Sequence, residues 1–266
     1  MSESNVKRWA WAEVNLAAYA NNIQSLKTLV APAEVWAVVK ANAYGHGAVP
    51  IAKSALTAGA SGLCVALSSE VMELRNAGVQ APILVLSQQP YESLPILLQH
   101  GATHTVYSIE YVNELVKHAM ALGVSQVPVH IKIDTGMHRV GAAPQLLTEL
   151  VRHVQELSPC LALEGIYTHF ANADEPEHPA NNEQSRLFAE ALNQLGHLTQ
   201  SLKIHSCNSA AAIRFPHERR SLVRVGISSY GLSPGPELTD DCSDLEPVMS
   251  LKARVSHVHV VQPGQG

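Results

Sequence analysis

The segment VWAVVKANAYGHG, residues 35–47, joins a buried-strand pattern to a polar loop. Its first five residues have the length and the β-branched content of a strand that is buried on both faces. This strand ends on Lys40, which places an amine at the rim of a sheet or barrel. Partial desolvation at such a rim disfavours the ammonium form and leaves a base that can attack a carbonyl carbon. A lone lysine in this position usually extends to solvent, so the functional interpretation depends on the rest of the chain.

Apolar segments of similar length recur along the chain and alternate with stretches of helical spacing. Further strands are expected at residues 62–66, 83–86, 105–107, 129–133, 164–168, 203–206 and 222–225. Helices are expected at residues 15–29, 48–58, 69–76, 90–100, 109–122, 144–157 and 183–199. This rhythm of about eight strand–helix units over roughly two hundred residues predicts an α/β fold, a (β/α)8 TIM-type barrel. A doubly wound open sheet is the alternative.

The composition is that of a globular protein with enough residues for a large core. The chain has 266 residues, 46% hydrophobic content and a formal net charge of -5, with no cluster of Lys and Arg. We therefore expect neither nucleic acid nor a membrane as a partner. Residues 1–8 are polar, and no apolar run approaches the ~18 residues of a bilayer-spanning helix, so a cytoplasmic location is expected. The cysteines are far apart, which predicts reduced thiols and no metal site: Cys64, Cys160, Cys207 and Cys242.

Polar side chains collect where the predicted strands end. They are Lys40, then Lys132, Asp134 and Arg139, then His169, then Asn208 and Ser209, and finally Arg224, Gly226 and Ile227. Taken singly, each has an ordinary explanation, such as a turn at residues 134–136 or a helix cap at residues 208–209. Five clusters at five strand ends instead predict an active site at the carboxyl face of a barrel.

Several of these segments resemble the successive signatures of the alanine racemase family. They are VVKANAYGHG at residues 38–47, IKIDTGMHRVG at 131–141, YTHFANAD at 167–174, CNSAA at 207–211 and VRVGISSYG at 223–231. The resemblance implies a pyridoxal-phosphate enzyme that interconverts L-alanine and D-alanine by two-base proton transfer at the alpha carbon, supplying D-alanine for peptidoglycan. It also implies a barrel followed by a β-rich carboxyl-terminal domain, and a head-to-tail homodimer.

The resemblance assigns a covalent and a phosphate-binding group of residues. Lys40 would hold pyridoxal phosphate through a Schiff base and then act as one of the two acid/bases. Tyr44 would donate to the phosphate, together with Ser209 and the backbone around Gly226 and Ile227, which follow the strands after which barrels commonly bind phosphate. Tyr230 is expected either on the phosphate side or in packing.

A second group is implied around the cofactor ring and the substrate. Arg224 would face the ring nitrogen, where its permanent proton keeps that nitrogen unprotonated. His169 would orient Arg224, and Asn208 would lie near the arginine and the ring. Arg139 would bind the substrate carboxylate near the phenolic oxygen of the cofactor. Lys132 would be carried as a carbamate, an anion that holds Arg139.

The chain departs from the family pattern at one position of the second signature. His138 stands where the family has a small or amide residue. Its imidazole is expected either to influence Arg139 or to point to solvent.

The resemblance also divides the chain. We expect residues 1–14 to be a strand segment of the β domain, residues 15–238 to be the cofactor-binding barrel, and residues 239–266 to begin a truncated carboxyl-terminal β domain. Residues 251–261 alternate like the first strand of that domain, whereas residues 9–14 are expected to pair with strands absent from this chain. The opposite-face tyrosine base of the family would come from the absent part of a partner subunit. His257 and His259 share one face of the expected strand, but a pair alone does not predict a metal site.

Two alternatives to an active racemase remain. One is a truncated barrel that binds the cofactor but has little activity. The other is a related barrel pyridoxal enzyme, such as an amino-acid decarboxylase or aldolase, which the matches at residues 132–139 and at Arg224 disfavour.

Overall fold

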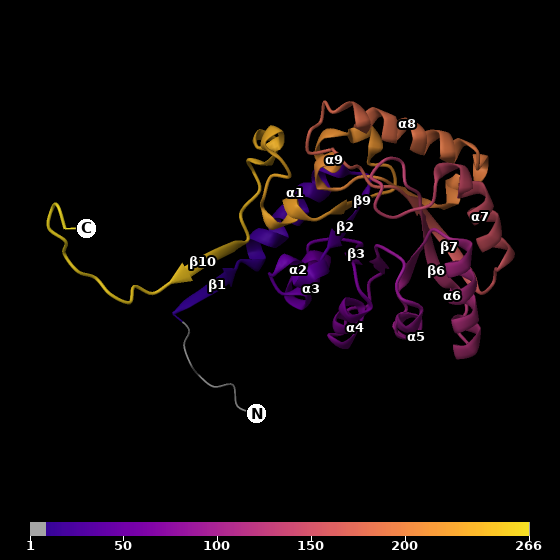
Figure 1. Ribbon diagram of the computed structural model, residues 1–266, viewed down its shortest axis with the longest axis horizontal. Helices are drawn as coiled ribbons and strands as arrows, with labels where there is room; N and C mark the ends of the chain where they lie inside the picture. Colours follow the sequence, from indigo (N-terminus) through magenta and orange to yellow (C-terminus); the bar gives the residue numbers. More distant parts are fainter. Residues whose placement is uncertain (1–8, 266) are drawn as a thin grey trace.

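The computed structural model describes residues 9–265, and at its centre lies a sheet of eight parallel strands (Figure 1). The strands are β2 (Glu34–Val38), β3 (Gly62–Val65), β4 (Ile83–Val85), β5 (Thr103–Val106), β6 (Val127–Lys132), β7 (Leu161–Tyr167), β8 (Lys203–His205) and β9 (Leu222–Val225). From β2 to β8 the spatial order follows the sequence order, and β9 pairs with β2 on its free side. A doubly wound sheet reverses its strand order near the middle, which this sheet does not. The open-sheet alternative is therefore wrong.

The two ends of the sheet approach each other, so the sheet is nearly a closed barrel. The N–H of Ser221 donates to the carbonyl of Ile204 at 3.0 Å, and the N–H of Arg224 donates to the carbonyl of Cys207 at 3.0 Å. These bonds link the segments that contain β8 and β9. The predicted (β/α)8 barrel is confirmed.

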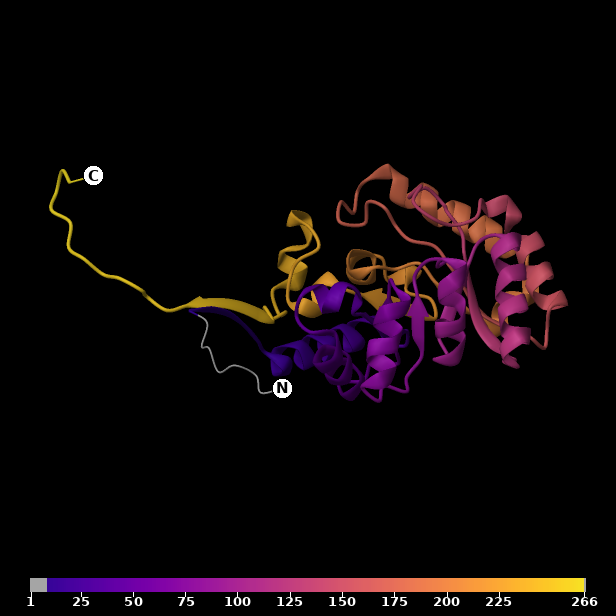
Figure 2. The same cartoon turned by 60° about the horizontal axis from the view of Figure 1, so that its bottom comes forward.

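Helices surround the sheet on its outside (Figures 1 and 2). They are α1 (Leu16–Val30), α3 (Ala48–Thr57), α4 (Ser68–Asn76), α5 (Leu94–Gln99), α6 (Ile109–Leu122), α7 (Leu147–Glu156), α8 (Pro179–Asn193) and α9 (Ser209–Arg214). Short 3-10 turns lie at Tyr91–Ser93, Pro144–Leu146, Gly196–Ser201, Pro216–Glu218, Ile227–Tyr230, Pro236–Leu238 and Asp240–Cys242. The apolar faces of the α-helices bury Tyr19, Ile23, Ile51, Leu115 and Phe188 against the barrel. This packing fixes the positions of the strands and therefore of the strand ends.

Side-chain caps explain where some helices begin. The Oδ1 atom of Asn15 accepts the N–H groups of Ala17 and Ala18 at 3.1 Å, and Ser108 accepts that of Tyr111 at 3.3 Å. Such oxygens satisfy amides that have no partner within the first helical turn. The helix expected at residues 183–199 starts earlier and ends at Asn193, because Pro179 suits a first helical turn and Gly196 adopts a positive φ of 54°.

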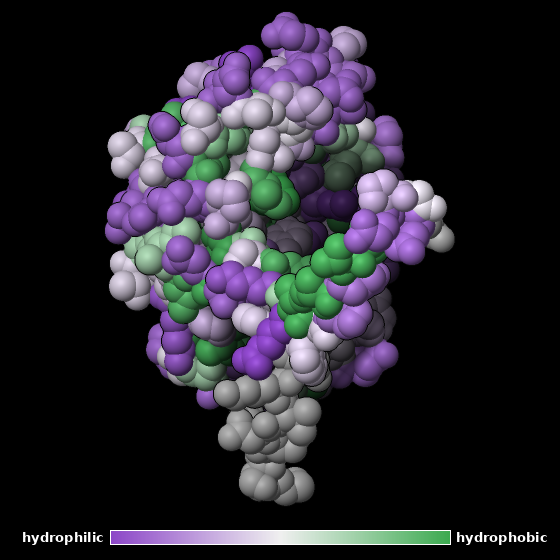
Figure 3. Space-filling model, turned by 90° about the vertical axis from the view of Figure 1, so that its left-hand side faces the viewer, coloured by the Kyte–Doolittle hydropathy of each residue, from purple (hydrophilic) through white to green (hydrophobic). Residues whose placement is uncertain are grey.

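A two-stranded ribbon projects from the barrel (Figures 1 and 2). It pairs β1 (Ala10–Val14) antiparallel with β10 (Met249–Ala253), with Ala12 opposite Leu251. Residues 9–14 were expected to pair with strands absent from this chain, whereas β1 pairs with β10 along one of its edges. The strand expected to reach residue 261 ends at Ala253. Apolar side chains are exposed along this region, with Leu251 82% exposed, and Figure 3 shows them on the face that carries the ribbon. Of the terminal segments expected to be β domain, residues 1–8 and 266 lie outside the described residues.

Within the described part of the chain, every helix falls short of the length and apolar character that crossing a bilayer requires. Among residues 9–265, no group of three or more His, Cys, Asp or Glu side chains is placed to hold a metal ion. The ring centroids of His257 and His259 lie 5.1 Å apart in the exposed segment after β10.

Candidate active site

A cavity of about 300 Å³ opens at the carboxyl ends of the strands. Its volume lies at the lower end of the range of about 300–1,000 Å³ for small-molecule sites. It is lined by every residue to which a binding or catalytic role was assigned: Lys40, Tyr44, Lys132, Arg139, His169, Asn208, Ser209, Arg224, Gly226 and Ile227. Residues far apart in the sequence meet here because the carboxyl ends of parallel strands share one face of a barrel.

Lys40 is partly buried and begins a turn of unusual handedness, α2 (Lys40–Tyr44). The four residues from Ala41 to Tyr44 have φ values between 52° and 53°, in the left-handed region. Non-glycine residues adopt this region at a cost of about 1–2 kcal/mol each, so other contacts must hold the turn. One such contact is the Oδ1 atom of Asn42, which accepts the N–H of Ala48 at 2.8 Å. The turn lets Lys40 and Tyr44, four residues apart, line the same cavity.

Hydroxyl groups and backbone amides form one side of the cavity. The Oγ atom of Ser209 accepts the N–H of Gly226 at 2.9 Å and that of Ser228 at 3.4 Å. A Cβ atom added to Gly226 would lie 3.1 Å from the hydroxyl oxygen of Tyr44, so a side chain here would crowd the phenol. Turned N–H groups beside hydroxyl donors are the chemistry that binds a phosphate.

Arg224 lies within β9 and is 3% exposed. Its Nη1 atom contacts Nδ1 of His205 at 2.5 Å, and its Nη2 atom contacts Nδ1 of His169 at 3.1 Å. Nη2 also donates to the carbonyls of Thr168 at 2.9 Å and Ser206 at 3.1 Å. A buried guanidinium needs such acceptors, since an unpaired charge is costly away from water. The arginine therefore has one fixed orientation toward the cavity it lines.

The histidines around Arg224 are neutral. Burial, followed by the charge of Arg224, lowers the pKa of His169 and of His205 well below the ordinary value. Both rings accept from the guanidinium at Nδ1, so each carries its proton on Nε2. His205 then donates from Nε2 to Nδ1 of His130 at 2.9 Å, and burial lowers the pKa of His130 to about 3. The hydrogen bonds from Arg224 through His205 to His130 thereby fix one tautomer for each of these two histidines.

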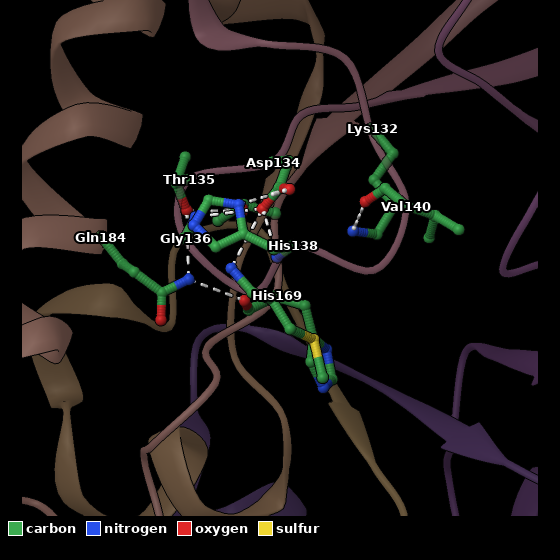
Figure 4. Close-up of polar contacts among 10 residues, drawn as sticks. Lys132, Asp134, Thr135, Gly136, His138, Val140, His169 and Gln184 are labelled. Atoms are coloured by element: carbon green, nitrogen blue, oxygen red, sulfur yellow. Dashed lines mark hydrogen bonds and ion pairs between the residues drawn. The ribbon is translucent and has the colours of Figure 1, made fainter.

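Lys132 ends β6 and is 4% exposed. Its ammonium group donates to the carbonyl of Val140 at 2.8 Å, as Figure 4 shows, and lies 5.6 Å from the centre of the Tyr167 ring. Burial, followed by the charge of Arg224, lowers the pKa of Lys132 from 10.5 to about 8. A substantial fraction of its amine is therefore uncharged at mildly alkaline pH.

The loop that carries Arg139 is organised by Asp134 (Figure 4). The Oδ1 atom of Asp134 accepts the N–H groups of Gly136, Met137 and His138, each at 3.0 Å. The imidazole of His138 is 84% exposed and lies 3.2 Å from the other carboxylate oxygen of Asp134. His138 also has a positive φ of 54°, a conformation that glycine or asparagine adopts more easily. The positive φ explains why a small or amide residue suits this position. The imidazole of His138 lies beside the carboxylate of Asp134.

Two residues also have structural roles. Asn208 caps α9, because its Oδ1 atom accepts the N–H of Ala211 at 3.0 Å, while the residue also lines the cavity. Tyr230 donates its hydroxyl to the carbonyl of Val38 at 3.0 Å, and its ring centre lies 5.2 Å from that of Tyr44. Of the two roles expected for Tyr230, the structure supports packing.

The sequence analysis missed three residues of this region. His205 supports Arg224 from inside the barrel, Tyr167 stacks on His205 with ring centres 4.6 Å apart, and Asp174 lines the cavity. Tyr167 and Asp174 lie within the segment 167–174 that was singled out, so their position was the available signal. Nothing in the sequence marks His205, because a histidine within a short strand looks like an ordinary core residue.

Comparison with known proteins gives a consistent result. The family model described as alanine racemase, N-terminal domain, matches residues 14–234. The alanine racemase of Desulforamulus reducens is 42% identical over 97% of this chain and 70% of its own length. Alanine racemase 1 of Bacillus subtilis is 37% identical over 100% of this chain and 67% of its own length.

Solved structures show the same relationship. The structure of alanine racemase from Bacillus anthracis with bound L-Ala-P is 40% identical, with a TM-score of 0.85 over 93% of this chain and 64% of that one. Alanine racemase from Clostridium difficile 630 gives a TM-score of 0.90 at 35% identity, over 98% of this chain and 68% of that one. This chain spans about two thirds of the length of these relatives. It belongs to the alanine racemase family.

Proposed function

We propose that this chain provides the cofactor-binding barrel of an enzyme that interconverts L-alanine and D-alanine with pyridoxal 5'-phosphate. One observation supports this most strongly: a single cavity is lined by a lysine amine, a fixed arginine and a cluster of phosphate donors. Arg139 and Arg224 bring guanidinium groups and Lys40 brings an amine to the cavity wall, against the carboxylate of Asp174. A wall of this charge suits a ligand that carries a phosphate and a carboxylate.

The donor set fits pyridoxal phosphate. Lys40 would hold the cofactor covalently through Nζ. Its phosphate would accept from Tyr44, Ser209 and the backbone at Gly226 and Ile227, where the absence of a Cβ at Gly226 leaves room beside the phenol. Arg224 would donate to the ring nitrogen, with His169 and Asn208 beside it.

Arg224 would leave the ring nitrogen of the cofactor unprotonated. When bound, pyridoxal phosphate withdraws electrons from the substrate alpha carbon and makes its hydrogen acidic. The guanidinium keeps its proton, because His205 and His169 accept hydrogen bonds from it and its intrinsic pKa is far above neutrality. Arg224 therefore donates a hydrogen bond without transferring a proton. With Arg224 keeping the ring nitrogen unprotonated, electron withdrawal would be moderate, and return of the proton to the alpha carbon would be favoured over transamination.

Proton transfer requires one acid/base on each face of the alpha carbon. Lys40 Nζ takes or returns the proton on one face, and Arg139 binds the substrate carboxylate. We propose that a tyrosine of a second subunit serves the opposite face in a homodimer. The described residues supply the lysine side of this pair.

Lys132 is proposed to carry a carbamate. Its lowered pKa leaves an uncharged amine that can attack the carbon of CO2, forming an N–C bond and releasing one proton. The product is an anion near Arg139, which it would hold by charge-assisted hydrogen bonds.

We also propose how the chain is divided into domains. We assign residues 15–238 to the cofactor-binding barrel, and residues 1–14 and 239–266 to a second, β-rich domain. The exposed apolar side chains of β10 suit burial by further strands of such a domain. A cytoplasmic location is supported by the cysteines, which are unpaired thiols at Cys64, Cys160, Cys207 and Cys242.

Solvent exchange at the alpha carbon tests the proposal. The protein is incubated with pyridoxal phosphate and either L-alanine or D-alanine in deuterated water, and deuterium at the alpha carbon is measured, because Lys40 serves only one face. We expect cofactor-dependent exchange that Lys40→Ala abolishes and that Lys53→Ala, an exposed substitution on α3, leaves intact. Exchange that is absent from the native protein with both enantiomers, or that survives in Lys40→Ala, would contradict the proposal.

A further inference from the structure

Glu70, in the first turn of α4, connects the ends of two neighbouring strands. Its Oε1 atom accepts the N–H of Ala41 at 2.5 Å, in the turn that follows β2. Its Oε2 atom accepts the N–H groups of Ala66 at 2.7 Å and Leu67 at 3.0 Å, directly after β3. The strands β2 and β3 are paired in parallel, so the carboxylate joins their carboxyl ends.

The bond to Ala41 acts at the peptide next to the proposed cofactor lysine. The N–H that Glu70 binds belongs to the peptide bond between Lys40 and Ala41, and Ala41 is the first residue with a positive φ, 52°. A carboxylate that accepts a backbone N–H makes a charge-assisted hydrogen bond, which is stronger than a neutral one. Fixing this peptide plane fixes where the main chain leaves Lys40 and enters the left-handed turn.

The other end of the carboxylate is itself anchored. The N–H of Glu70 donates to the carbonyl of Leu67 at 3.2 Å, while the side chain of Glu70 accepts the N–H of Leu67. This reciprocal arrangement ties the side chain to the start of α4. Glu70 therefore reaches Ala41 from a rigid support.

We propose that Glu70 is a positioning residue that holds the left-handed turn, and through it Lys40 and Tyr44, in the geometry that binds the cofactor phosphate and aldehyde. Glu70 is not among the residues that line the cavity, so it acts through the backbone of Ala41. This inference rests on the proposed function for its ligand, but the conformation of the turn can be measured without the ligand.

Glu70→Gln distinguishes the hydrogen bonds at the start of α4 from the hydrogen bond to Ala41. The amide oxygen can still accept from the two N–H groups of Ala66 and Leu67, which places the NH2 group against the N–H of Ala41. The variant thus keeps the contacts at the start of α4 and loses the bond to the turn. Glu73→Gln is the matched control, because Glu73 lies on the same helix and is exposed.

Ala41→Gly provides a rescue that depends on the proposed cause. Glycine adopts a positive φ without the steric cost of a Cβ, so the turn would need less support from Glu70. Ala41 is exposed, and the substitution therefore removes little packing. If Glu70 holds the turn, Ala41→Gly should restore part of what Glu70→Gln loses.

Two measurements test the proposal. The first is hydrogen–deuterium exchange of residues 38–47 in the cofactor-free protein, where Glu70→Gln should exchange at least about tenfold faster than native protein or Glu73→Gln. The second is the dissociation constant for pyridoxal phosphate, which should rise at least about tenfold, or about 1.4 kcal/mol, and fall back in the double variant with Ala41→Gly.

Exchange and affinity in Glu70→Gln within twofold of Glu73→Gln would overturn the inference. So would a loss of affinity that Ala41→Gly leaves unchanged, since a general loss of stability would not depend on the turn. Should Glu70→Gln not fold, Glu70→Asp, with its shorter acid, should show the same two changes to a smaller extent, and their absence there would also overturn the inference. Failure of the native protein to bind pyridoxal phosphate would instead reject the proposed function, while the exchange experiment would still decide the role of Glu70.

Discussion

The guanidinium of Arg224 and the imidazole of His205 meet at 2.5 Å inside the barrel, with Nδ1 of the ring facing Nη1 of the arginine. The ring accepts this bond because burial and the neighbouring charge keep it neutral. Arg224 is thus presented to the cavity by a neutral partner, and its full positive charge remains available to a ligand.

Replacing His205 should remove this support. In His205→Leu, one buried N–H of Arg224 loses its acceptor, which we expect to lower the free energy of unfolding by about 1–3 kcal/mol. The affinity for pyridoxal phosphate should fall as well, because the guanidinium loses its fixed orientation. Urea denaturation and a cofactor titration measure the two effects. His197→Leu, at an exposed position, is the control, and equal behaviour of the two variants would count against the role of His205.

Gly226→Ala should weaken cofactor binding. The added Cβ would lie 3.1 Å from the Tyr44 hydroxyl and 3.6 Å from Cβ of Val38, so the phenol must move. We expect the dissociation constant for pyridoxal phosphate, measured on the folded variant, to rise about tenfold or more. An unchanged dissociation constant would show that the phosphate is bound elsewhere.

Lys132 should make the free energy of unfolding depend on pH in the alkaline range. Its pKa is about 8 in the folded protein, whereas an ordinary lysine titrates near 10.5. Between these values the folded state has released a proton that the unfolded state still binds, so stability rises with pH, by about 3 kcal/mol in total. Denaturation from pH 7 to 10.5 in CO2-free buffer should show this rise in the native protein relative to Lys132→Met. A constant difference between the two proteins would contradict the lowered pKa.

His104 should make the free energy of unfolding depend on pH in the acidic range. The ring is 1% exposed on β5, neither of its nitrogens has a hydrogen-bond partner among the described residues, and burial lowers its pKa to about 4. As pH falls from 6.5 toward 4, the unfolded state gains a proton that the folded state does not, so stability falls, by about 2 kcal/mol at pH 5. His104→Leu should remove this part of the acid sensitivity. The prediction fails if the stability of the variant relative to native protein is the same at pH 8 and pH 5.

The sequence allowed the barrel to be predicted because short apolar runs alternate with helical stretches, and five of the eight runs lead to chemically distinctive residues. The run that ends before Lys40 and the one that contains Arg224 illustrate this, and the two strands pair side by side in the structure. The pattern of alternating segments is local, and a barrel is the fold that brings such strand ends together. The cavity likewise follows from strand ends, which explains why the residues with an assigned binding or catalytic role line it, whereas Asp134 and Tyr230 do not.

Other features depend on contacts that a linear pattern does not encode. The left-handed turn at Ala41 to Tyr44 is built from residues that rarely adopt positive φ, and distant groups such as Glu70 hold it. The support of Arg224 by His205 comes from the way two strands approach across the barrel. The pairing of β1 with β10 was missed because the two segments lie at opposite ends of the described chain. Each case is a tertiary contact that overrides local preference.

The covalent attachment of pyridoxal phosphate tests the central claim most directly. The protein is loaded with the cofactor, reduced with borohydride, digested, and mapped by mass spectrometry, with Lys40→Ala treated in parallel. We predict a pyridoxyl group on Lys40 and an unlabelled Lys40→Ala protein. A label on Lys132 or another lysine, or no label on the native protein, would contradict the account.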